Sequence, residues 1–201
     1  MPPWSRLALN AEAGPVVDDL TLVAIVAAAR VAGLPVAAHV QGAGQAERAI
    51  EHGVAILAHA PWSEALPRRV IEAAAARTTW ISTLGMHRRD GDDAAWGCAV
   101  DNLLRFAQAG GAVLHGTDLG NGTSRLGIDD EEVASLVTAA LGAGRVVDAL
   151  VGAPLDALLG RAASSTTALP EDVADDEAAI WSLHAARAVT AADLDPASFA
   201  A

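Results

Sequence analysis

Three polar residues that follow apolar segments of the chain have the chemistry of a catalytic site. His39 ends PVAAH, His59 ends VAILAH, and Asp118 ends AVLHGTD. In a parallel α/β protein the carboxyl ends of the strands converge on one face, where the loops build the active site. Two imidazoles and one carboxylate gathered there can bind a divalent metal ion. Zinc is the metal that we expect at this single site.

Each of these residues also has a structural interpretation. The two histidines can be core residues bonded to backbone carbonyls, and Asp118 can belong to a turn built on Asx hydrogen bonds. We favour a functional role for Asp118 because it closes its segment in register with both histidines.

Four further residues lie near these positions in the sequence. His115 is expected to pack beneath the site or to support a ligand from behind. Thr83 can offer a hydroxyl group to the site. We expect His87, in the loop after Thr83, to contact the substrate, and a solvated loop histidine is the equal alternative. Trp62 is expected to shape the pocket wall or else to fill the core.

Other polar residues carry weaker signals. Arg88 and Arg89 are candidates for holding a substrate carboxylate, and solvated loop arginines are the alternative. His52 closes a predicted helix, where a positive charge suits the helix dipole. The sequence gives His184 no role.

The elements that must position these residues alternate between strand and helix. Repeated units of about 20 to 35 residues predict a parallel sheet with crossover helices. The strands read as short apolar runs, as in a barrel wall or a sheet covered on both faces. The predicted strands are residues 7–10, 36–40, 54–58, 78–83 and 112–114. The predicted helices are residues 19–31, 45–52, 64–77, 93–109 and 129–141, with a loop at 86–92 and a helix at 146–159 broken around Pro154.

Composition limits the classes of function. The chain has 201 residues, 52% of them hydrophobic, which is enough for a real core. It contains no lysine, and its net charge of -12 argues against nucleic acid and anionic membrane as partners. Cys98 is the single cysteine, so no disulfide framework exists, and we expect a buried structural thiol. No targeting signal or membrane span is predicted, which suggests a cytoplasmic protein.

The ordered set of segments resembles the second half of the barrel of the amidohydrolase superfamily, in its imidazolonepropionase-like and prolidase-like branch. The segments AGLPVAAHVQGAGQAERAIEHGVAILAHAPW, WISTL and FAQAGGAVLHGTDLGNG resemble its strand five to strand eight regions. The resemblance covers roughly residues 5–160. It implies that His39 and Asp118 are metal ligands, and that His59 binds a second metal or orients the substrate.

The resemblance also implies a fold and an activity. We expect an α/β fold, a (β/α) barrel-derived partial TIM barrel that lacks the first strands, over residues 1–160. Residues 161–201 are predicted to form an acidic loop and a C-terminal extension. The implied enzyme is a metal-dependent hydrolase that cleaves a C–N bond in a small-molecule amide or cyclic amide. In such an enzyme, a metal-activated water attacks the carbonyl carbon, Asp118 takes a proton, and His59 polarises the carbonyl oxygen.

Three departures from the superfamily pattern keep other functions open. The His-x-His pair of the superfamily's first strand has no counterpart, because no two histidines here are two residues apart. No lysine is present to be carboxylated and bridge two metals. The sequence offers five candidate strands, whereas a barrel has eight. The chain can therefore be inactive in this form, a non-catalytic remnant that associates with a partner chain. A partner or a homo-oligomer would cover the open barrel edge. A phosphate- or nucleotide-binding domain with an anion cradle at residues 42–44 or 116–122 is a further alternative, although neither segment matches a known phosphate loop.

Overall fold

The computed structural model describes residues 4–119, 127–160, 166–168 and 176–189. Within these residues, five parallel strands form one sheet in the order in which they occur along the chain. The strands are β1 (Ser5–Asn10), β2 (Val36–Gln41), β3 (Ile56–Leu57), β4 (Thr79–Ile81) and β5 (Ala112–Leu114). The sheet and its crossover helices confirm the predicted α/β fold.

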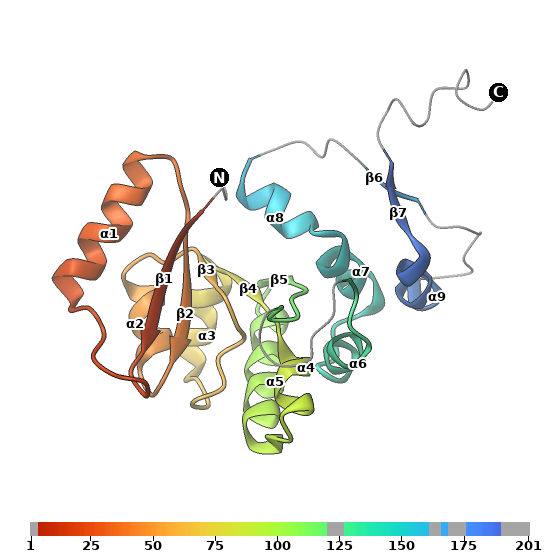
Figure 1. Ribbon diagram of the computed structural model, residues 1–201, viewed down its shortest axis with the longest axis horizontal. Helices are drawn as coiled ribbons and strands as arrows, with labels where there is room; N and C mark the ends of the chain where they lie inside the picture. Colours follow the sequence, from red (N-terminus) through yellow and green to blue (C-terminus); the bar gives the residue numbers. More distant parts are fainter. Residues whose placement is uncertain (1–3, 120–126, 161–165, 169–175, 190–201) are drawn as a thin grey trace.

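Helices connect the strands and continue beyond the last one (Figure 1). The connecting helices are α1 (Asp19–Val31), α2 (Gln45–Glu51), α3 (Arg68–Ala75), α4 (Leu84–Arg89) and α5 (Asp93–Gln108). After β5 come α6 (Asp130–Thr138), α7 (Ala143–Val151), α8 (Ala153–Leu158) and α9 (Asp176–Ser182). A short 3-10 helix (Leu183–Ala185) precedes the second strand of an antiparallel pair, β6 (Thr166–Ala168) and β7 (Arg187–Val189).

Aspartate side chains begin three of these helices. Asp18 accepts a hydrogen bond from the backbone N–H of Thr21 at 2.8 Å, and Asp92 accepts one from Ala95 at 2.9 Å. Asp129 caps α6 in the same way. Because such caps satisfy backbone donors that a helix leaves unpaired, they fix where each helix starts.

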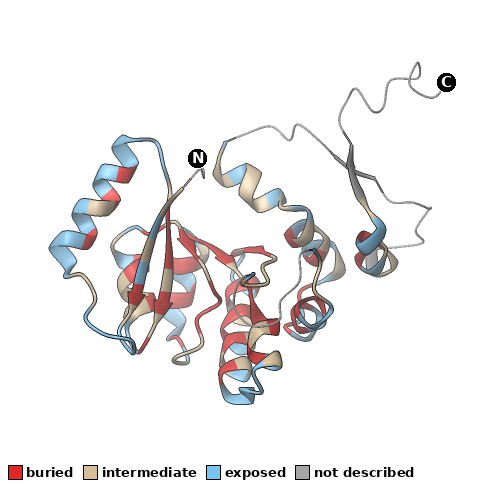
Figure 2. Cartoon of the chain, in the orientation of Figure 1, coloured by how far each residue is buried: buried red, intermediate tan, exposed pale blue. Residues whose placement is uncertain are grey.

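The core lies between the sheet and the helices that cover it, and Figure 2 shows the buried residues along the strands and on the inner helix faces. Its largest side chains are the fully buried Trp80 of β4 and Phe106 of α5. Their rings stack with centroids 3.9 Å apart and an interplanar angle of 2°. The Phe106 ring also lies against Gly111, so a Cβ atom at that glycine would be 2.4 Å from it. Helix α5 is therefore locked to the start of β5.

Helix α1 leaves much of its surface uncovered. It packs on the sheet through Leu22, Val26 and Ala29, while Leu20 and Val31 are 84% and 91% exposed. Most of its surface is accordingly shown as exposed in Figure 2. An apolar face of α1 is thus left without a neighbour among the described residues.

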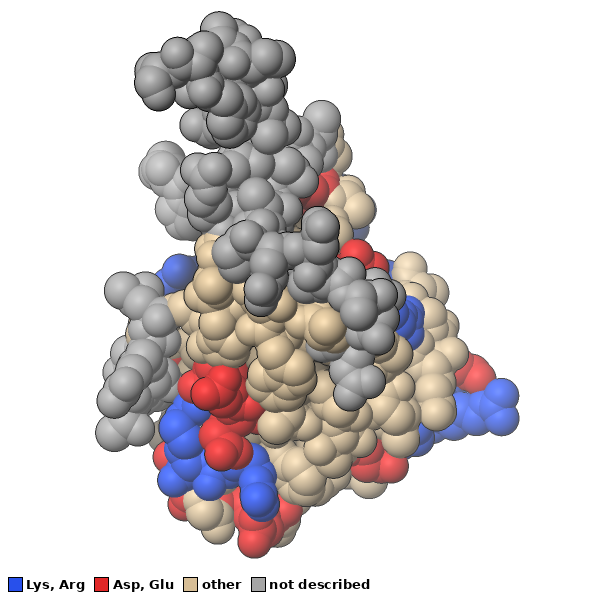
Figure 3. Space-filling view, turned by 90° about the vertical axis from the view of Figure 1, so that its right-hand side faces the viewer, with Lys and Arg blue, Asp and Glu red and all other residues tan. Residues whose placement is uncertain are grey.

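Charged residues on the side that carries α6 and α7 are mixed in sign. Figure 3 shows arginine and acidic side chains next to each other there, beside a broad area of uncharged residues. Among the described residues, no helix is both long and apolar enough to cross a membrane.

The structure corrects several predicted boundaries. Helix α3 begins at Arg68 because Pro67 adopts an extended conformation, with ψ of 149°, which ends any helix begun at residue 64. The loop predicted at residues 86–92 is wrong, since helix α4 occupies most of it. The break near residue 154 occurs at Gly152, whose φ of +78° suits glycine, and the following proline fits the first turn of α8.

Two smaller predictions also change. Cys98 is half-buried rather than buried, and burial raises the pKa of its thiol. Strand β6 lies within the segment predicted as an acidic loop, whereas residues 161–165 and 169–175 of that segment lie outside the described residues.

Candidate functional site

The two predicted histidines lie side by side at the carboxyl ends of neighbouring strands. His39 is on β2, opposite Ala8 of β1, and His59 follows β3 by two residues. Their ring centroids are 4.9 Å apart in a T-shaped arrangement. Trp62 packs edge-on against both rings, at 5.8 Å and 5.5 Å, and its place in the pocket wall stays a prediction.

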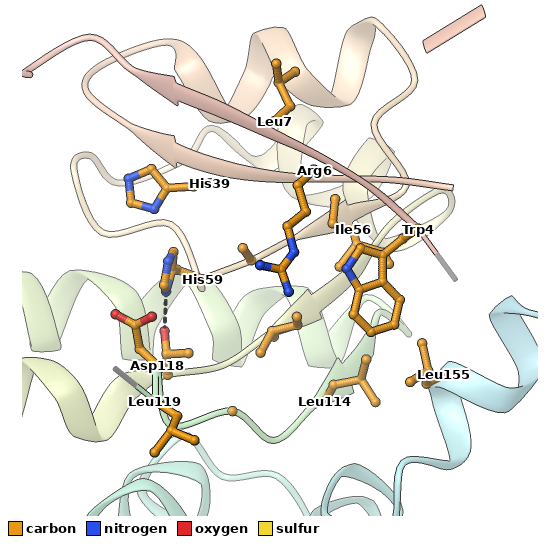
Figure 4. Close-up of a pocket in the computed structure, with 15 residues that line it drawn as sticks. Trp4, Arg6, Leu7, His39, Ile56, His59, Leu114, Asp118, Leu119 and Leu155 are labelled. Atoms are coloured by element: carbon orange, nitrogen blue, oxygen red, sulfur yellow. Dashed lines mark hydrogen bonds between the residues drawn. The ribbon is translucent and has the colours of Figure 1, made fainter. Parts of the chain in front are cut away.

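His59 is held in one orientation and kept neutral. Its Nδ1 atom is 2.8 Å from the Thr83 hydroxyl, the contact drawn as a dashed line in Figure 4. The pKa of His59 is lowered to about 4, chiefly by burial and also by the nearby His39, while Asp118 acts to raise it. A neutral imidazole with one nitrogen anchored can use the other nitrogen as a donor or as an acceptor toward the cavity.

Two site residues have backbone conformations that residues other than glycine rarely adopt. Thr83 and Asp118 both have φ of +51°. This left-handed conformation is costly for residues other than glycine and persists where surrounding contacts impose it. Gly116, two residues before Asp118, has no room for a side chain, since a Cβ atom there would be 2.3 Å from Cγ2 of Ile81.

His39, His59, Thr83 and Asp118 line one cavity of about 380 Å³. Figure 4 shows His59 above Asp118 at one end, with the Arg6 side chain extending between His59 and Trp4. The remaining lining residues are mostly apolar: Trp4, Leu7, Ala37, Ile56, Ala58, Ile81, Leu114, Gly116, Leu119 and Leu155. The cavity therefore combines a polar end with an apolar wall, as small-molecule sites do.

Arg6 is a cavity residue that sequence reasoning missed. The strand was predicted to begin at residue 7, whereas β1 begins at Ser5 and places Arg6 opposite Ala37. Within the described part of the chain, the Arg6 guanidinium has no hydrogen-bond or ion-pair partner. Side-chain alternation along a longer strand would have been the signal, because residues 6 and 8 share a face.

The predicted metal ligands do not by themselves form a metal-binding group. In the described residues, no set of three or more His, Cys, Asp or Glu side chains is arranged to hold an ion. The donor types suit zinc, but the Nδ1 atom of His59 is engaged by Thr83, and Nε2 of His39 lies 3.3 Å from the Gln41 amide oxygen. The metal site stays a prediction.

His87 is not a solvated loop residue. It belongs to helix α4, is 5% exposed, and packs on Trp62 with ring centroids 5.1 Å apart. Burial lowers the pKa of His87. Neither residue is among those that line the cavity, so His87 contacts Trp62 rather than the cavity, and its contact with a substrate stays a prediction.

His115 directly follows β5, and its backbone N–H donates to the carbonyl oxygen of Ala149 in α7 at 3.1 Å. Burial lowers the pKa of His115, and its electrostatic neighbours are Asp129 and His184. Its Nε2 atom is buried without a hydrogen-bond partner among the described residues. The prediction that it supports a ligand from behind stays open.

The arginines proposed as carboxylate holders have other partners. Arg88 pairs with Asp93 at 2.7 Å and lies over the Trp96 ring. Arg89 pairs with Asp129 at 2.7 Å and donates to the carbonyl oxygen of Thr117. Both act between elements rather than in the cavity.

The first predicted anion cradle is not open to a ligand. The N–H of Gly42 donates to the Ser63 hydroxyl at 2.9 Å, and the N–H of Gly44 donates to the Glu64 carboxylate at 2.6 Å. Part of the second predicted cradle, residues 120–122, lies outside the described residues.

Comparison with solved structures defines the class of fold. The chain is similar to a Xaa-Pro dipeptidase with methionine bound in its active site, at 18% identity and a TM-score of 0.67, covering 89% of this chain and 51% of that one. It is also similar to the ochratoxinase of A. niger, at 18% identity and a TM-score of 0.58, covering 75% of this chain and 38% of that one. A prolidase complexed with N-methylphosphonate-L-proline is similar at 15% identity, with a TM-score of 0.54 and coverage of 74% and 38%.

The chain thus spans about half or less of the length of these structures. Its five-stranded parallel sheet with crossover helices has the fold of part of these structures, as predicted for an α/β chain derived from a (β/α) barrel. No protein family model matches the sequence, and comparison with curated proteins gives no match.

Proposed function

We propose that this chain is the site-bearing part of a hydrolase of the amidohydrolase superfamily, which cleaves a C–N bond in a small molecule. The observation that supports this most is the cavity shared by His39, His59 and Asp118 at the carboxyl ends of parallel strands. The similar structures named as dipeptidase, prolidase and ochratoxinase support the same class of reaction.

The chemistry follows from the protonation states at the polar end of the cavity. When Thr83 donates to Nδ1 of the neutral His59, the Nε2–H group can donate to the carbonyl oxygen of an amide. The Asp118 carboxylate accepts a proton from the attacking water and passes it to the leaving nitrogen as the C–N bond breaks. The products are a carboxylic acid and an amine.

Arg6 suggests the kind of amide that would bind. Its guanidinium has no partner among the residues that the structure describes, and it shares the cavity with apolar side chains such as Trp4 and Leu155. Arg6 is an exposed residue whose charge solvent screens, so a substrate carboxylate would pair with it mainly through two parallel hydrogen bonds to the guanidinium. We therefore propose an amide that carries a carboxylate and an apolar group.

We also propose that the chain binds a divalent metal ion, with zinc expected, and its metal content has to be measured. His39, His59 and Asp118 are the side chains that this chain would contribute, and further donors would have to come from outside the described residues. A cytoplasmic location likewise stays an expectation.

Release of amine from N-acyl amino acids and dipeptides tests the proposal, with the metal content of the same preparation measured by elemental mass spectrometry. We expect Asp118→Asn to lower kcat at least about 100-fold. Arg6→Gln should raise KM for carboxylate substrates roughly 10- to 100-fold and leave neutral amides unaffected. An active Asp118→Asn variant would contradict the proposed chemistry.

The alternative is a non-catalytic protein that acts by association with a partner chain. The exposed apolar residues of α1, next to the open edge of β1, favour this alternative. It requires the folded chain to show no hydrolysis and to form a complex.

A further inference from the structure

We propose that Glu132 is a positioning residue that caps helix α4 from outside and thereby leaves the Thr83 hydroxyl free to orient His59. The inference rests on the proposed function, because His59 is part of the proposed site. Its evidence is the set of contacts between the start of α6 and the turn that follows β4.

Glu132 is a fully buried acid in the first turn of α6. Its Oε2 atom accepts a hydrogen bond from the backbone N–H of Gly85 at 2.6 Å. The approach is close, since a Cβ atom at Gly85 would be 2.8 Å from the backbone nitrogen of Glu132. This contact fastens the beginning of α4 to the beginning of α6.

The bond to Gly85 occupies an N–H group that the N-cap side chain of a helix commonly binds. Thr83 is the N-cap residue of α4, and a threonine in this position commonly accepts a hydrogen bond from the second or third N–H of its helix. Gly85 supplies the second of these N–H groups, yet the Thr83 side chain makes no capping bond. Because Glu132 satisfies that donor, the Thr83 side chain need not turn back toward its own helix, and its hydroxyl lies 2.8 Å from Nδ1 of His59.

The same helix start also holds the segment next to Asp118. Asp129 caps α6 by accepting from the N–H of Glu132 at 2.9 Å, and its other oxygen pairs with Arg89 at 2.7 Å. Arg89 in turn donates to the carbonyl oxygen of Thr117 at 3.3 Å. The two left-handed residues of the site, Thr83 and Asp118, are thus each tied to the first turn of α6.

The protonation of Glu132 fits a neutral capping role. Burial raises the pKa of Glu132 to about 7, against the lowering effects of Ser82, Gly85 and Arg89. A protonated acid still accepts a hydrogen bond from an N–H group, and so does the amide oxygen of glutamine.

The test is the ¹⁵N NMR spectrum of the His59 ring at a fixed pH, in the histidine-labelled chain, with His59→Asn to assign the signals. Glu132→Ala should return the Thr83 hydroxyl to the N–H of Gly85 and shift the Nδ1 signal of His59. Glu132→Gln should retain the wild-type signal, as should Glu131→Ala on the exposed side of the same turn. An unchanged Nδ1 signal in Glu132→Ala would overturn the proposal.

A second measurement keeps the test decisive if Glu132→Ala does not fold. Hydrogen exchange of the Gly85 amide should be equally slow in the wild type and in Thr83→Val, because the threonine is not its acceptor. Loss of protection in Thr83→Val would show that Thr83 is the cap and would refute the role of Glu132. Both readouts are independent of hydrolysis. An inactive chain would therefore contradict the proposed function and leave this inference unaffected.

Discussion

Buried polar residues decide how this site behaves, and Glu132 is the clearest case. It is fully buried, it holds the N–H of Gly85, and its Oε1 atom has no hydrogen-bond partner among the described residues. An ionised carboxylate with an unpaired oxygen is costly in such surroundings. The neighbouring titratable groups are Asp129, which raises its pKa, and Arg89, which lowers it.

We predict that Glu132 makes the free energy of unfolding decrease as the pH rises. Unfolding lowers its pKa from about 7 to the ordinary 4.5, so between these values the folded chain holds a proton that the unfolded chain has lost. Glu132→Gln should remove this dependence, and urea unfolding of the two proteins from pH 5 to pH 8.5 measures it. The difference between them should change by on the order of 3 kcal/mol. Parallel pH profiles would contradict the assignment.

The sequence indicated the residues at the polar end of the cavity, but it did not indicate Glu132, which holds the turn behind them. His39, His59 and Asp118 could be found because each follows an apolar strand-like segment, and parallel strands bring such positions together. Glu132 could not be singled out, since an acid in the first turn of a helix ordinarily complements the helix dipole. Its burial against Gly85 depends on tertiary packing that no local pattern encodes.

At the scale of elements, close approaches fix how helices meet the sheet. Gly111 leads into β5 directly under the Phe106 ring, which is itself stacked on Trp80. Any side chain at residue 111 must displace this aromatic pair. Gly97, in the middle of α5, has open space around it and serves as the matched control.

Gly111→Ala should therefore lower the free energy of unfolding by roughly 1–3 kcal/mol because it overpacks the core. Gly97→Ala should instead raise it by about 0.5–1 kcal/mol, since alanine favours a helix. Urea denaturation of both variants measures the two effects. A neutral Gly111→Ala would mean that the Phe106 ring can move aside freely.

Elements with strong local signals were predicted, and those made by tertiary contacts were not. Helix α5 agrees with its predicted range to within a residue, and its cap at Asp92 is visible in the sequence. Helix α4 has six residues, too few for a stable isolated helix, and depends on its docking against α6. Its existence therefore could not be inferred from residues 84–89.

For the whole molecule, the edge of the sheet at β1 is the place where we expect association with another chain. Strand β1 is an edge of the described sheet, and α1 beside it exposes Leu20, Val23 and Val31. Unpaired strand groups next to apolar side chains favour pairing with another chain.

We predict concentration-dependent association through this surface, measured by sedimentation velocity. The double variant Leu20→Glu/Val31→Glu should shift the chain toward monomer, because it places charges on the apolar face of α1. Val137→Glu on α6, a position that is also exposed, should have no effect. A wild-type chain that is monomeric at every concentration would refute an interface on α1 between copies of the chain.

The agreement between strand order in the sheet and strand order in the chain also bears on synthesis. Each strand pairs with the one made just before it, through a connection of one or two helices. A chain emerging from the ribosome could add one strand at a time to a growing sheet, without waiting for a distant segment. The polar end of the cavity would form last, when the segment ending in Asp118 reaches the two histidines already in place.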